Sequence, residues 1–187
     1  MAAAPQPGFF YIAPMTPIYT QRLRLIPATA LLLRADLEGR EALSQATGCH
    51  VSEDWPPELY DAQAIQYTLD LMEQSPAHLE WPLYYITLPE PESALIGVIG
   101  YKGPPDLEGQ VEIGYSVLPS NRRLGYAAEA AAALVQRAWA HPDVQAVIAE
   151  TLPELQASIG VLEKCGFEYI GEGSEPGVIR YRLMRRD

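Results

Sequence analysis

A short basic turn, NRRLGYAAEA at residues 121–130, holds the residues whose types and spacing best suit binding chemistry. It follows the apolar segment VEIGYSVLP and precedes a run of alanines, so a strand is expected to lead through it into a helix. The first backbone N–H groups of a helix lack intrahelical acceptors, and the helix dipole places partial positive charge there. Gly125 lets backbone approach a ligand closely, and the guanidinium groups of Arg122 and Arg123 suit phosphate oxygens. The turn predicts an anion site, although the same residues would also suit a solvated turn.

Two common phosphate-binding patterns are absent from this turn. The segment contains neither GxxxxGK[ST] nor a dinucleotide-binding GxGxxG pattern. Aspartate is also absent from residues 107 to 142. A metal-binding carboxylate pair of the kinase or nucleotidyl-transfer kind is therefore not expected beside the turn.

Composition narrows the classes of partner. The 187 residues carry a net charge of −11, and this acidic excess argues against a nucleic-acid partner. It permits a cationic substrate, although solubility alone explains much surface charge. Cys49 and Cys165 lie far apart, and the neighbours Cys49 and His50 have no second pair to complete a zinc site, so no metal is expected. Isolated thiols favour a reducing, cytoplasmic location.

Residues 1–17 are expected to form an irregular arm that precedes a single domain of residues 18–187. The arm contains prolines and no Lys or Arg, unlike a secretory signal. No stretch of the chain approaches the roughly 18 consecutive apolar residues of a membrane-spanning helix. The sequence thus predicts no membrane partner.

Periodicity and turn residues predict a mixed α+β domain. Alternation of apolar and polar residues indicates strands, and apolar residues spaced by three and four indicate helices. The expected helices cover residues 28–48, broken near Gly39, then 58–74, 125–140 and 157–167, the last closed by Gly166. The expected strands cover residues 19–27, 82–89, 94–103, 110–119, 144–152, 167–172 and 178–184. The order is β-α-α-β-β-β-α-β-α-β-β, with an antiparallel meander over residues 82–119.

Several of these segments together resemble the GNAT N-acetyltransferases, in particular the RimJ/RimL type. The similarity rests on ALIGVIGYKG, VEIGYSVLPSNRRLGYAAEA and ASIGVLEKCGFEYIGE, in the family's order, and on the opening segment TQRLRLIPAT. It covers about residues 19 to 186. It implies a mixed, mostly antiparallel central sheet with helices on both faces, and with two splayed central strands at residues 110–118 and 144–151.

The resemblance implies that the basic turn holds acetyl-CoA as a cosubstrate, with no metal. The family's R/Q-x-x-G-x-G/A pattern matches RRLGYA, whose backbone amides would wrap the pyrophosphate. The end of the preceding strand would pair with the pantetheine arm like an added strand, and a serine of the next helix would lie near the sulfur of CoA. The residues implied in cofactor binding are Val117, Leu118, Arg122, Arg123, Leu124, Gly125, Tyr126, Ala127 and Ser158.

Acetyl transfer to an amine requires an acceptor for the amine proton, a stabilised oxyanion and a proton donor for the departing thiolate. Glu112, on the strand that would reach the thioester, is the first candidate for the base, and Glu150 on the next strand is the second. Either could instead be an ordinary strand carboxylate. Ser158 is the candidate donor, or else a helix cap. Three tyrosines are further candidate donors, unless they serve the core: Tyr115, Tyr126 and Tyr169.

Two other regions bear on the site. This sequence departs from the family's usual N-x-A-S pattern, because Leu155 stands at the asparagine position with Gln156 beside it. Trp55 lies between the two early helices with the acidic residues Glu53, Asp54, Glu58 and Asp61, where similar enzymes roof the acceptor pocket. An acidic, aromatic roof would suit an amine, although the same residues would form an ordinary polar loop with one anchoring tryptophan.

The predicted function is therefore acetyl-CoA-dependent transfer of an acetyl group to a primary amine, at a protein N-terminus or on a small molecule, by direct attack on the thioester. Two alternatives stay open at this point. One is a catalytically silent acyl-CoA-binding sensor, and the other is a phosphate-binding or structural interaction domain that holds no CoA. The sequence permits either a monomer or a homodimer.

Overall fold

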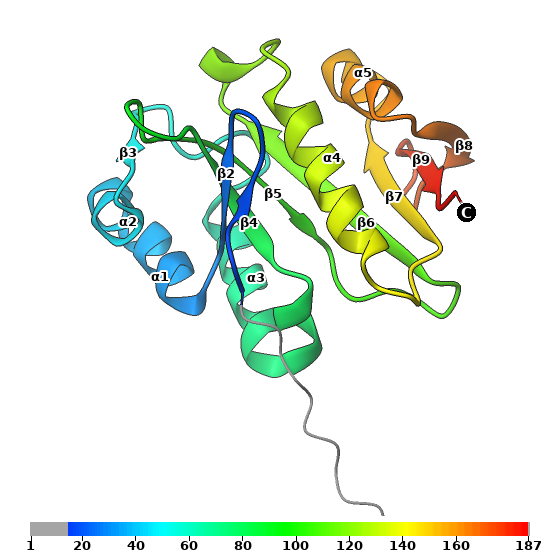
Figure 1. The fold of residues 1–187 in the computed structure, drawn as a ribbon, viewed down its shortest axis with the longest axis horizontal. Coiled ribbons are helices and arrows are strands. Elements are labelled where there is room, and N and C mark those ends of the chain that lie inside the picture. The colour runs from blue at the N-terminus through cyan, green and yellow to red at the C-terminus, as the bar shows by residue number, and fades with distance from the viewer. Residues whose placement is uncertain (1–14, 187) are drawn as a thin grey trace, which may run out of the picture.

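A computed structural model describes residues 15–186, which form a nine-stranded sheet flanked by helices (Figure 1). Residues 1–14 of the expected arm lie outside the described residues. The strands are β1 (Ile18–Tyr19), β2 (Arg24–Pro27), β3 (His50–Val51), β4 (Leu83–Thr87), β5 (Ala94–Tyr101), β6 (Gln110–Val117), β7 (Ala146–Thr151), β8 (Glu168–Glu172) and β9 (Ile179–Met184). The helices are α1 (Ala30–Glu38), α2 (Arg40–Thr47), α3 (Ala62–Gln74), α4 (Tyr126–Trp139) and α5 (Gln156–Lys164), with short 3₁₀ turns η1 (Pro76–Glu80) and η2 (Pro119–Asn121).

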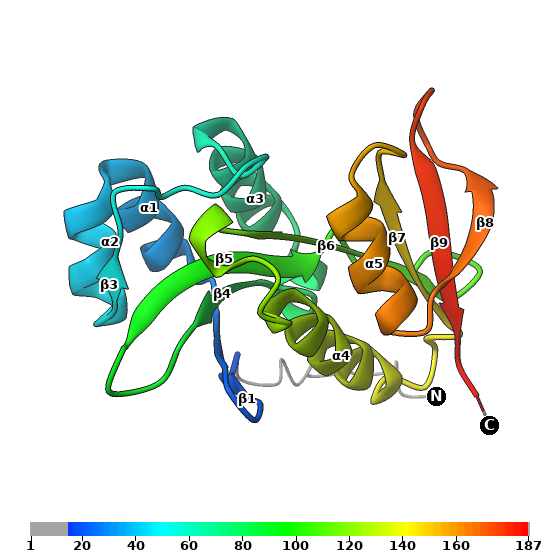
Figure 2. The same ribbon diagram turned by 90° about the horizontal axis from the view of Figure 1, so that it is seen from above.

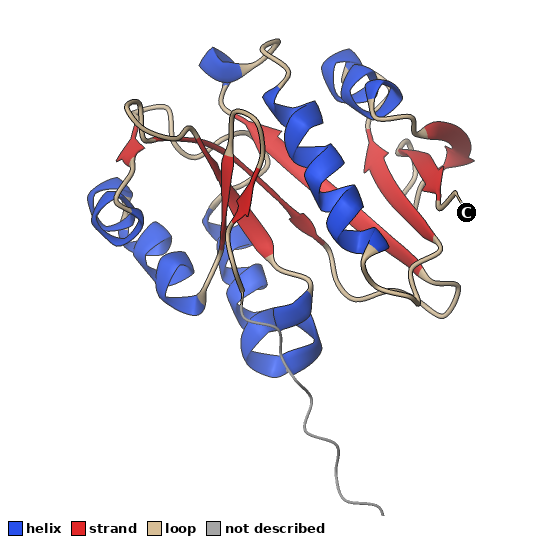
Figure 3. Cartoon of the chain, viewed as in Figure 1, coloured by secondary structure: helices blue, strands red, loops and turns tan. Residues whose placement is uncertain are grey.

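The sheet is mostly antiparallel, as the sequence predicts. Its strand order is β1-β2-β4-β5-β6-β7-β9-β8, and β3 pairs with β5 off this path. Only the β3–β5 and β6–β7 pairs run parallel within the described residues. Helices cover both faces: Figure 2 shows α1, α2 and α3 on one side of the sheet and α4 on the other, and Figure 3 shows the strands as the layer between them.

Local signals explain where the helices begin and end. The expected break at Gly39 separates α1 from α2, and the side chain of Thr29 caps α1. Helix α3 begins later than the predicted residue 58, because the side chain of Asp61 accepts a hydrogen bond from the N–H of Ala64 and so sets the first turn. The end of α5 follows the expected glycine pattern, since Phe167 N–H donates to the carbonyl of Leu162.

The predicted first strand, residues 19–27, is in fact a hairpin. Thr20 N–H donates to the carbonyl of Leu23 and turns the chain between β1 and β2. Strand β3 was not predicted at all, because its two residues gain strand character only by pairing with β5, far away in the sequence. Pairing with a distant strand leaves no periodic signal in so short a segment.

The sheet opens between β6 and β7, as expected for splayed central strands. Their parallel pairing runs only from Gln110 opposite Ala146 to Ile113 opposite Ala149. Beyond this point β6 stays paired with β5 as far as Val117, while β7 stays paired with β9. The two strand ends therefore diverge, and on that side the last residues of β6 pair with no other strand within residues 15–186.

The β1–β2 hairpin is hydrogen-bonded to the first turn of α4 through the side chain of Glu129. One carboxylate oxygen accepts from the hydroxyl of Thr20 at 2.6 Å and from the backbone N–H of Arg22 at 2.7 Å. The other oxygen accepts from Nε of Arg22 at 2.7 Å, and Nη1 of Arg22 donates to the carbonyl of Leu124 at 2.8 Å. Burial acts to raise the pKa of Glu129, but the hydrogen bonds from Thr20 and Arg22 outweigh it and lower that pKa. The hairpin thus fixes the turn that precedes α4.

A buried carboxylate, Asp36 of α1, anchors the loop before α3. Its oxygens accept from Trp55 Nε1 at 2.8 Å, from the hydroxyl of Tyr60 at 3.1 Å and from the hydroxyl of Tyr85 at 2.9 Å. Burial raises the pKa of Asp36, and the three donors partly oppose that rise.

None of the helices within residues 15–186 combines the length and apolar character needed to cross a bilayer.

Replacing Asp36 with alanine is expected to lower the free energy of unfolding by about 3 kcal/mol, because three buried donors lose their acceptor. Chemical denaturation followed by tryptophan fluorescence measures the change. The matched control is Asp54→Ala, which alters an exposed aspartate of the same loop and should leave the free energy within about 0.5 kcal/mol of the wild type. Equal stabilities for the two variants would contradict the anchoring role.

Glu129→Gln is expected to flatten the acid limb of the stability curve. A folded-state pKa below the unfolded value gives stability that is present above the unfolded pKa and is lost as pH falls through the folded pKa. The wild type should therefore lose free energy of unfolding between about pH 5 and pH 3 more steeply than the variant. Glu92→Gln changes an exposed glutamate and serves as the control, with an acid limb like that of the wild type.

Candidate active site

A cleft of about 1070 Å³ joins the turn before α4, the opening between β6 and β7, and the side of α3. One wall comes from the end of β6 and from α5, and the other from α3 and the loop that leads into it. The cleft therefore lies where the sheet parts, and the residues that line it come from between Glu58 and Val178.

The turn before α4 presents a row of free backbone donors to this cleft. Arg123 and Gly125 have φ values of 62° and 83°, a left-handed conformation that glycine adopts without strain. Within residues 15–186, the N–H groups of residues 123–128 donate to no backbone acceptor, and no side chain caps the helix. Arg123, Gly125, Tyr126 and Ala127 line the cleft. Such a row at a helix N-terminus suits an anion.

Two further cations approach Gly125, and sequence analysis missed both. A Cβ atom at Gly125 would lie 3.2 Å from Nη2 of Arg22 and 3.8 Å from Nζ of Lys164. Arg22 also lies over the ring of Tyr126, 4.8 Å from its centroid. Neither residue carries a local signal for this role, because hairpin and α5 packing alone bring them to the turn.

Arg122 lines the cleft, but its guanidinium group already has partners. Nε donates to the carbonyl of Val117 at 3.0 Å, and Nη2 pairs with Oε2 of Glu58 at 2.8 Å. The hydroxyl of Ser116 also donates to the carbonyl of Glu58, at 2.6 Å. Arg122 thus ties the end of β6 to the loop before α3, whereas the sequence suggested direct contact with phosphate.

Two of the expected binding residues do not face the cleft. The side chain of Leu118 is only 1% exposed and packs in the core under α1 to α3, and its N–H donates to the carbonyl of Ile96. That hydrogen bond leaves Leu118 no backbone donor for a ligand. Leu124 points its side chain to solvent and its carbonyl to Arg22, so it offers only its free N–H.

Ser158 and Tyr115 meet at the wall of the cleft. The phenol of Tyr115 donates to the carbonyl of Ser158 at 3.0 Å and lies 3.3 Å from the serine hydroxyl. Burial raises the pKa of Tyr115 to about 12, so the phenol keeps its proton at neutral pH. Ser158 does not cap the helix, because α5 begins two residues earlier, at Gln156.

The other two candidate tyrosines lie apart from Ser158. Tyr126 lines the cleft at the start of α4, beside Arg22. Tyr169 lies on the exposed strand β8 and packs against Tyr181, with 5.7 Å between ring centroids, away from the cleft-lining residues. Of the three, only Tyr115 combines burial with a contact to Ser158.

Glu112 lies at the point where β6 and β7 begin to part. It still pairs with Ile148 in the parallel register, and Gly114, the next residue on the same face of β6, lies beyond the last pair. The carboxylate forms an ion pair with Lys102, whose side chain lines the cleft. Glu112 itself stands just outside the lining, so it can serve the opening only across Gly114.

Glu150, the second candidate base, is fully engaged. Ser174 donates to it from its hydroxyl at 2.6 Å and from its N–H at 2.8 Å, and Nε of Arg180 donates at 2.7 Å. Burial acts to raise its pKa, but these donors prevail and lower it. A carboxylate so held is a poor proton acceptor.

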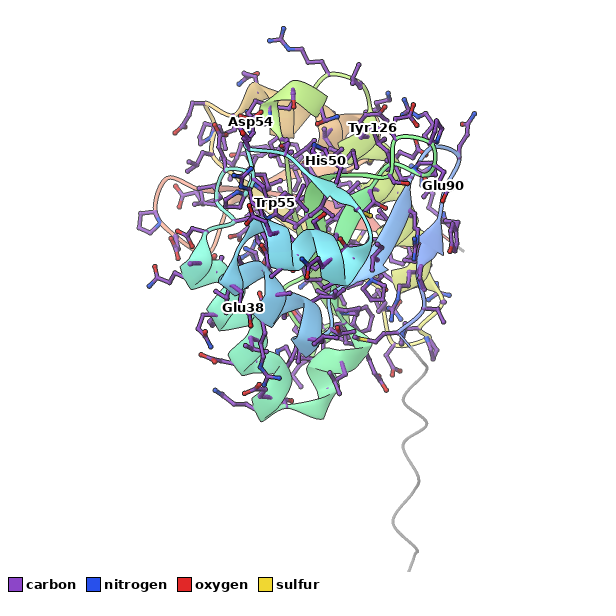
Figure 4. All side chains as sticks on the ribbon, turned by 90° about the vertical axis from the view of Figure 1, so that its left-hand side faces the viewer. Glu38, His50, Asp54, Trp55, Glu90 and Tyr126 are labelled. Atoms are coloured by element: carbon purple, nitrogen blue, oxygen red, sulfur yellow. The ribbon has the colours of Figure 1, made fainter. Side chains whose placement is uncertain are left out.

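The expected acceptor roof of Glu53, Asp54 and Trp55 does not reach the cleft. Trp55 is 7% exposed and donates its N–H to Asp36, whereas Glu53 and Asp54 are exposed. Figure 4 labels Trp55 and Asp54 on this loop. Residues 58–60, later in the same loop, line the cleft, and Glu58 is one of the residues expected in the roof. A role for this loop in binding the acceptor stays a prediction.

Leu155 stands where similar enzymes usually have an asparagine, and the structure shows what replaces that polar contact. Leu155 and Gln156 both line the cleft, but Nε2 of Gln156 donates to the carbonyl of Pro153 at 2.8 Å. The glutamine therefore ends the loop before α5 and has one donor fewer for a ligand. Leu155 makes this part of the wall apolar.

Comparison with known proteins agrees with this geometry. Residues 22–168 match the model of the acetyltransferase (GNAT) domain family. The chain is 28% identical to the uncharacterized N-acetyltransferase YjdG of Bacillus subtilis over 153 aligned residues. The aligned region covers 82% of this chain and 90% of that protein.

Solved structures share the fold. An acetyltransferase from Agrobacterium tumefaciens superposes with a TM-score of 0.67 at 22% identity, over 97% of this chain and 100% of that one. The ribosomal L7/L12 alpha-N-protein acetyltransferase RimL in complex with coenzyme A superposes with a TM-score of 0.63 at 18% identity, over 90% of this chain and 98% of that one. The match to the domain family spans most of the chain, and we conclude that this protein belongs to the GNAT family and is an N-acetyltransferase.

Proposed function

We propose that this protein transfers the acetyl group of acetyl-CoA to a primary amine, which attacks the thioester directly. The observation that carries the proposal is the row of free N–H groups at residues 123–128, which opens onto a cleft between two parted strands. The similar RimL structure holds coenzyme A, which supports the same cosubstrate here. No residue of this chain needs to act as a nucleophile, because the thioester supplies the activated acyl group.

The chain offers complementary groups along the length of such a cosubstrate. Free amides at the start of α4 suit the pyrophosphate, with Arg22 and Lys164 adding positive charge beside Gly125. Beyond Ile113 the edge of β6 pairs with no strand among the described residues, so it is open to an extended amide-bearing arm, although Arg122 donates to the carbonyl of Val117 at its end. The anionic end and the extended arm would then lie on two consecutive segments of the chain.

The residues at the opening suit the proton transfers of the reaction. The amine nitrogen bonds to the carbonyl carbon and loses a proton, and the carbon–sulfur bond breaks with its electron pair on sulfur. Glu112, beside the point where β6 and β7 part, is our candidate proton acceptor, acting through water across Gly114, because Glu150, which lines the cleft, is held by three donors. Tyr115, protonated at neutral pH and paired with Ser158, is placed to return a proton to the thiolate. The products are an amide and free CoA thiol.

The acceptor is either an α-amino group of a protein or a small-molecule amine. The name of RimL records a protein acceptor for that enzyme. A cytoplasmic location and a monomeric or homodimeric state stay predictions from the sequence.

Gly125→Ala is expected to weaken acetyl-CoA binding at least tenfold. The new Cβ strains a φ of 83° and crowds Arg22, so the free amides lose their alignment. Isothermal titration with acetyl-CoA measures the dissociation constant. The control, Gly48→Ala, puts the same strain on a left-handed glycine with open space around it, far from the cleft lining. Equal losses in both variants, or no binding by the wild type, would contradict the proposed cradle.

Glu112→Gln is expected to lower kcat by roughly 10²- to 10³-fold with little change in acetyl-CoA affinity, because a positioned base contributes about that much. The release of free thiol with the best amine of a panel measures kcat. Glu108→Gln alters an exposed glutamate in the turn before the same strand and should keep full activity. Acetyl-CoA binding without thiol release from any amine would instead indicate an acyl-CoA-binding sensor.

A further inference from the structure

Helix α3 carries a second apolar face that the core does not use. Ile65 and Leu69 are buried against the core, as expected for a helix on a sheet. A different stripe lines the cleft, formed by Tyr67, Thr68 and Leu71, next to Ala64, which also packs against the core. Tyr67 is 64% exposed, although an aromatic ring gains free energy from burial. This stripe offers apolar surface to whatever occupies the acceptor half of the cleft.

Further apolar side chains ring the same space. Leu59, which is 87% exposed, stands at the end of the loop before α3. Leu152 and Leu155 face the cleft from the segment between β7 and α5. Exposed leucines are unremarkable when scattered, but here they gather around one opening and mark a binding surface.

The carboxylates around the cleft are already neutralised. Glu58 pairs with Arg122 at 2.8 Å, Glu150 pairs with Arg180 at 2.6 Å, and Glu112 pairs with Lys102. Among the described cleft-lining residues, Glu175 is the one carboxylate without an ion pair, and it is exposed on the turn between β8 and β9. The cleft can therefore match one ammonium group but has no array of free carboxylates for several.

We propose that the acceptor is a primary monoamine carried on an apolar body. The body packs against Tyr67 and Leu71 of α3, and the nitrogen points toward the opening between β6 and β7. The inference rests on the proposed acetyl transfer and names its substrate class. A polyamine or an aminoglycoside would leave several ammonium groups facing leucine, tyrosine and already paired carboxylates, which costs their solvation without replacing it.

The first experiment measures the release of free thiol and compares kcat/KM across substrates that all carry a primary amine but differ in the rest of the molecule. The panel contains 2-phenylethylamine and hexylamine as apolar monoamines, spermidine and kanamycin as polycations, and two peptides that differ only in a first residue of Phe or Ser. We expect the apolar monoamines to exceed both polycations by at least tenfold, and the Phe peptide to exceed the Ser peptide. The two peptides test whether a protein N-terminus can present the same chemistry. Equal or higher values for spermidine, kanamycin or the Ser peptide would overturn the proposal.

The second experiment changes the wall itself. Tyr67→Ala should raise KM for 2-phenylethylamine about tenfold, because the substrate loses the binding free energy of part of an aromatic contact. The values of kcat and of the acetyl-CoA dissociation constant should stay unchanged. Tyr67→Glu should shift the ratio of kcat/KM values toward spermidine by tenfold or more, because it adds an unpaired carboxylate. Gln66→Ala, on an exposed position of the same helix, is the matched control and should change neither ratio. Unchanged KM in Tyr67→Ala and an unchanged ratio in Tyr67→Glu would overturn the assignment of this wall.

Titration with acetyl-CoA distinguishes failure of the proposed substrate class from failure of the proposed function. If acetyl-CoA binds and amines are acetylated without preference for apolar bodies, the substrate class is wrong and the proposed function stands. If acetyl-CoA does not bind, both are wrong.

Discussion

The site depends on the separation of two parallel strands. Backbone groups inside a sheet normally satisfy one another, and a strand edge left open must find another partner. Strands β6 and β7 stop pairing after Ile113 and Ala149, yet each keeps its outer neighbour, so the sheet stays intact while its centre opens. Tyr115 bridges this opening by donating from β6 to the carbonyl of Ser158 on α5. Helix α5 is therefore bonded to β6 at the edge of the opening.

Positive charge also gathers at the turn before α4, in a strongly acidic chain. The net charge is −11, yet Arg22, Arg123 and Lys164 gather at the start of α4 beside unpaired amides. Glu129, one turn into the helix, forms an ion pair with Arg22, so it secures the turn and offsets the charge of that one cation. Long-range attraction of an anion toward an acidic protein is weak at physiological salt. Binding there must come from short hydrogen bonds at the turn.

Sequence analysis succeeded where the signal was local. Gly39, Gly166 and the basic turn each act through their own backbone, and the structure has a break, a helix end and a row of free amides at those places. It failed where the partner lies far away in the chain. The role of Trp55 depends on Asp36, that of Arg122 depends on Glu58, and the burial of Leu118 depends on packing across the sheet. No spacing within a segment records such contacts, so several side chains of the predicted site have partners in the structure that the sequence did not indicate.

The loop before α3 connects the two halves of the cleft. Asp36 fixes its beginning through Trp55, and Glu58 binds both Ser116 and Arg122 near its end. Arg122 in turn holds the carbonyl of Val117, the last residue of β6. The apolar wall that would receive an amine and the strand that would align a thioester are thus bonded to one another through two side chains. Because reacting atoms must meet within about 3.5 Å, a shift of either half would misalign the other, and this short chain of polar contacts is what fixes their relative position.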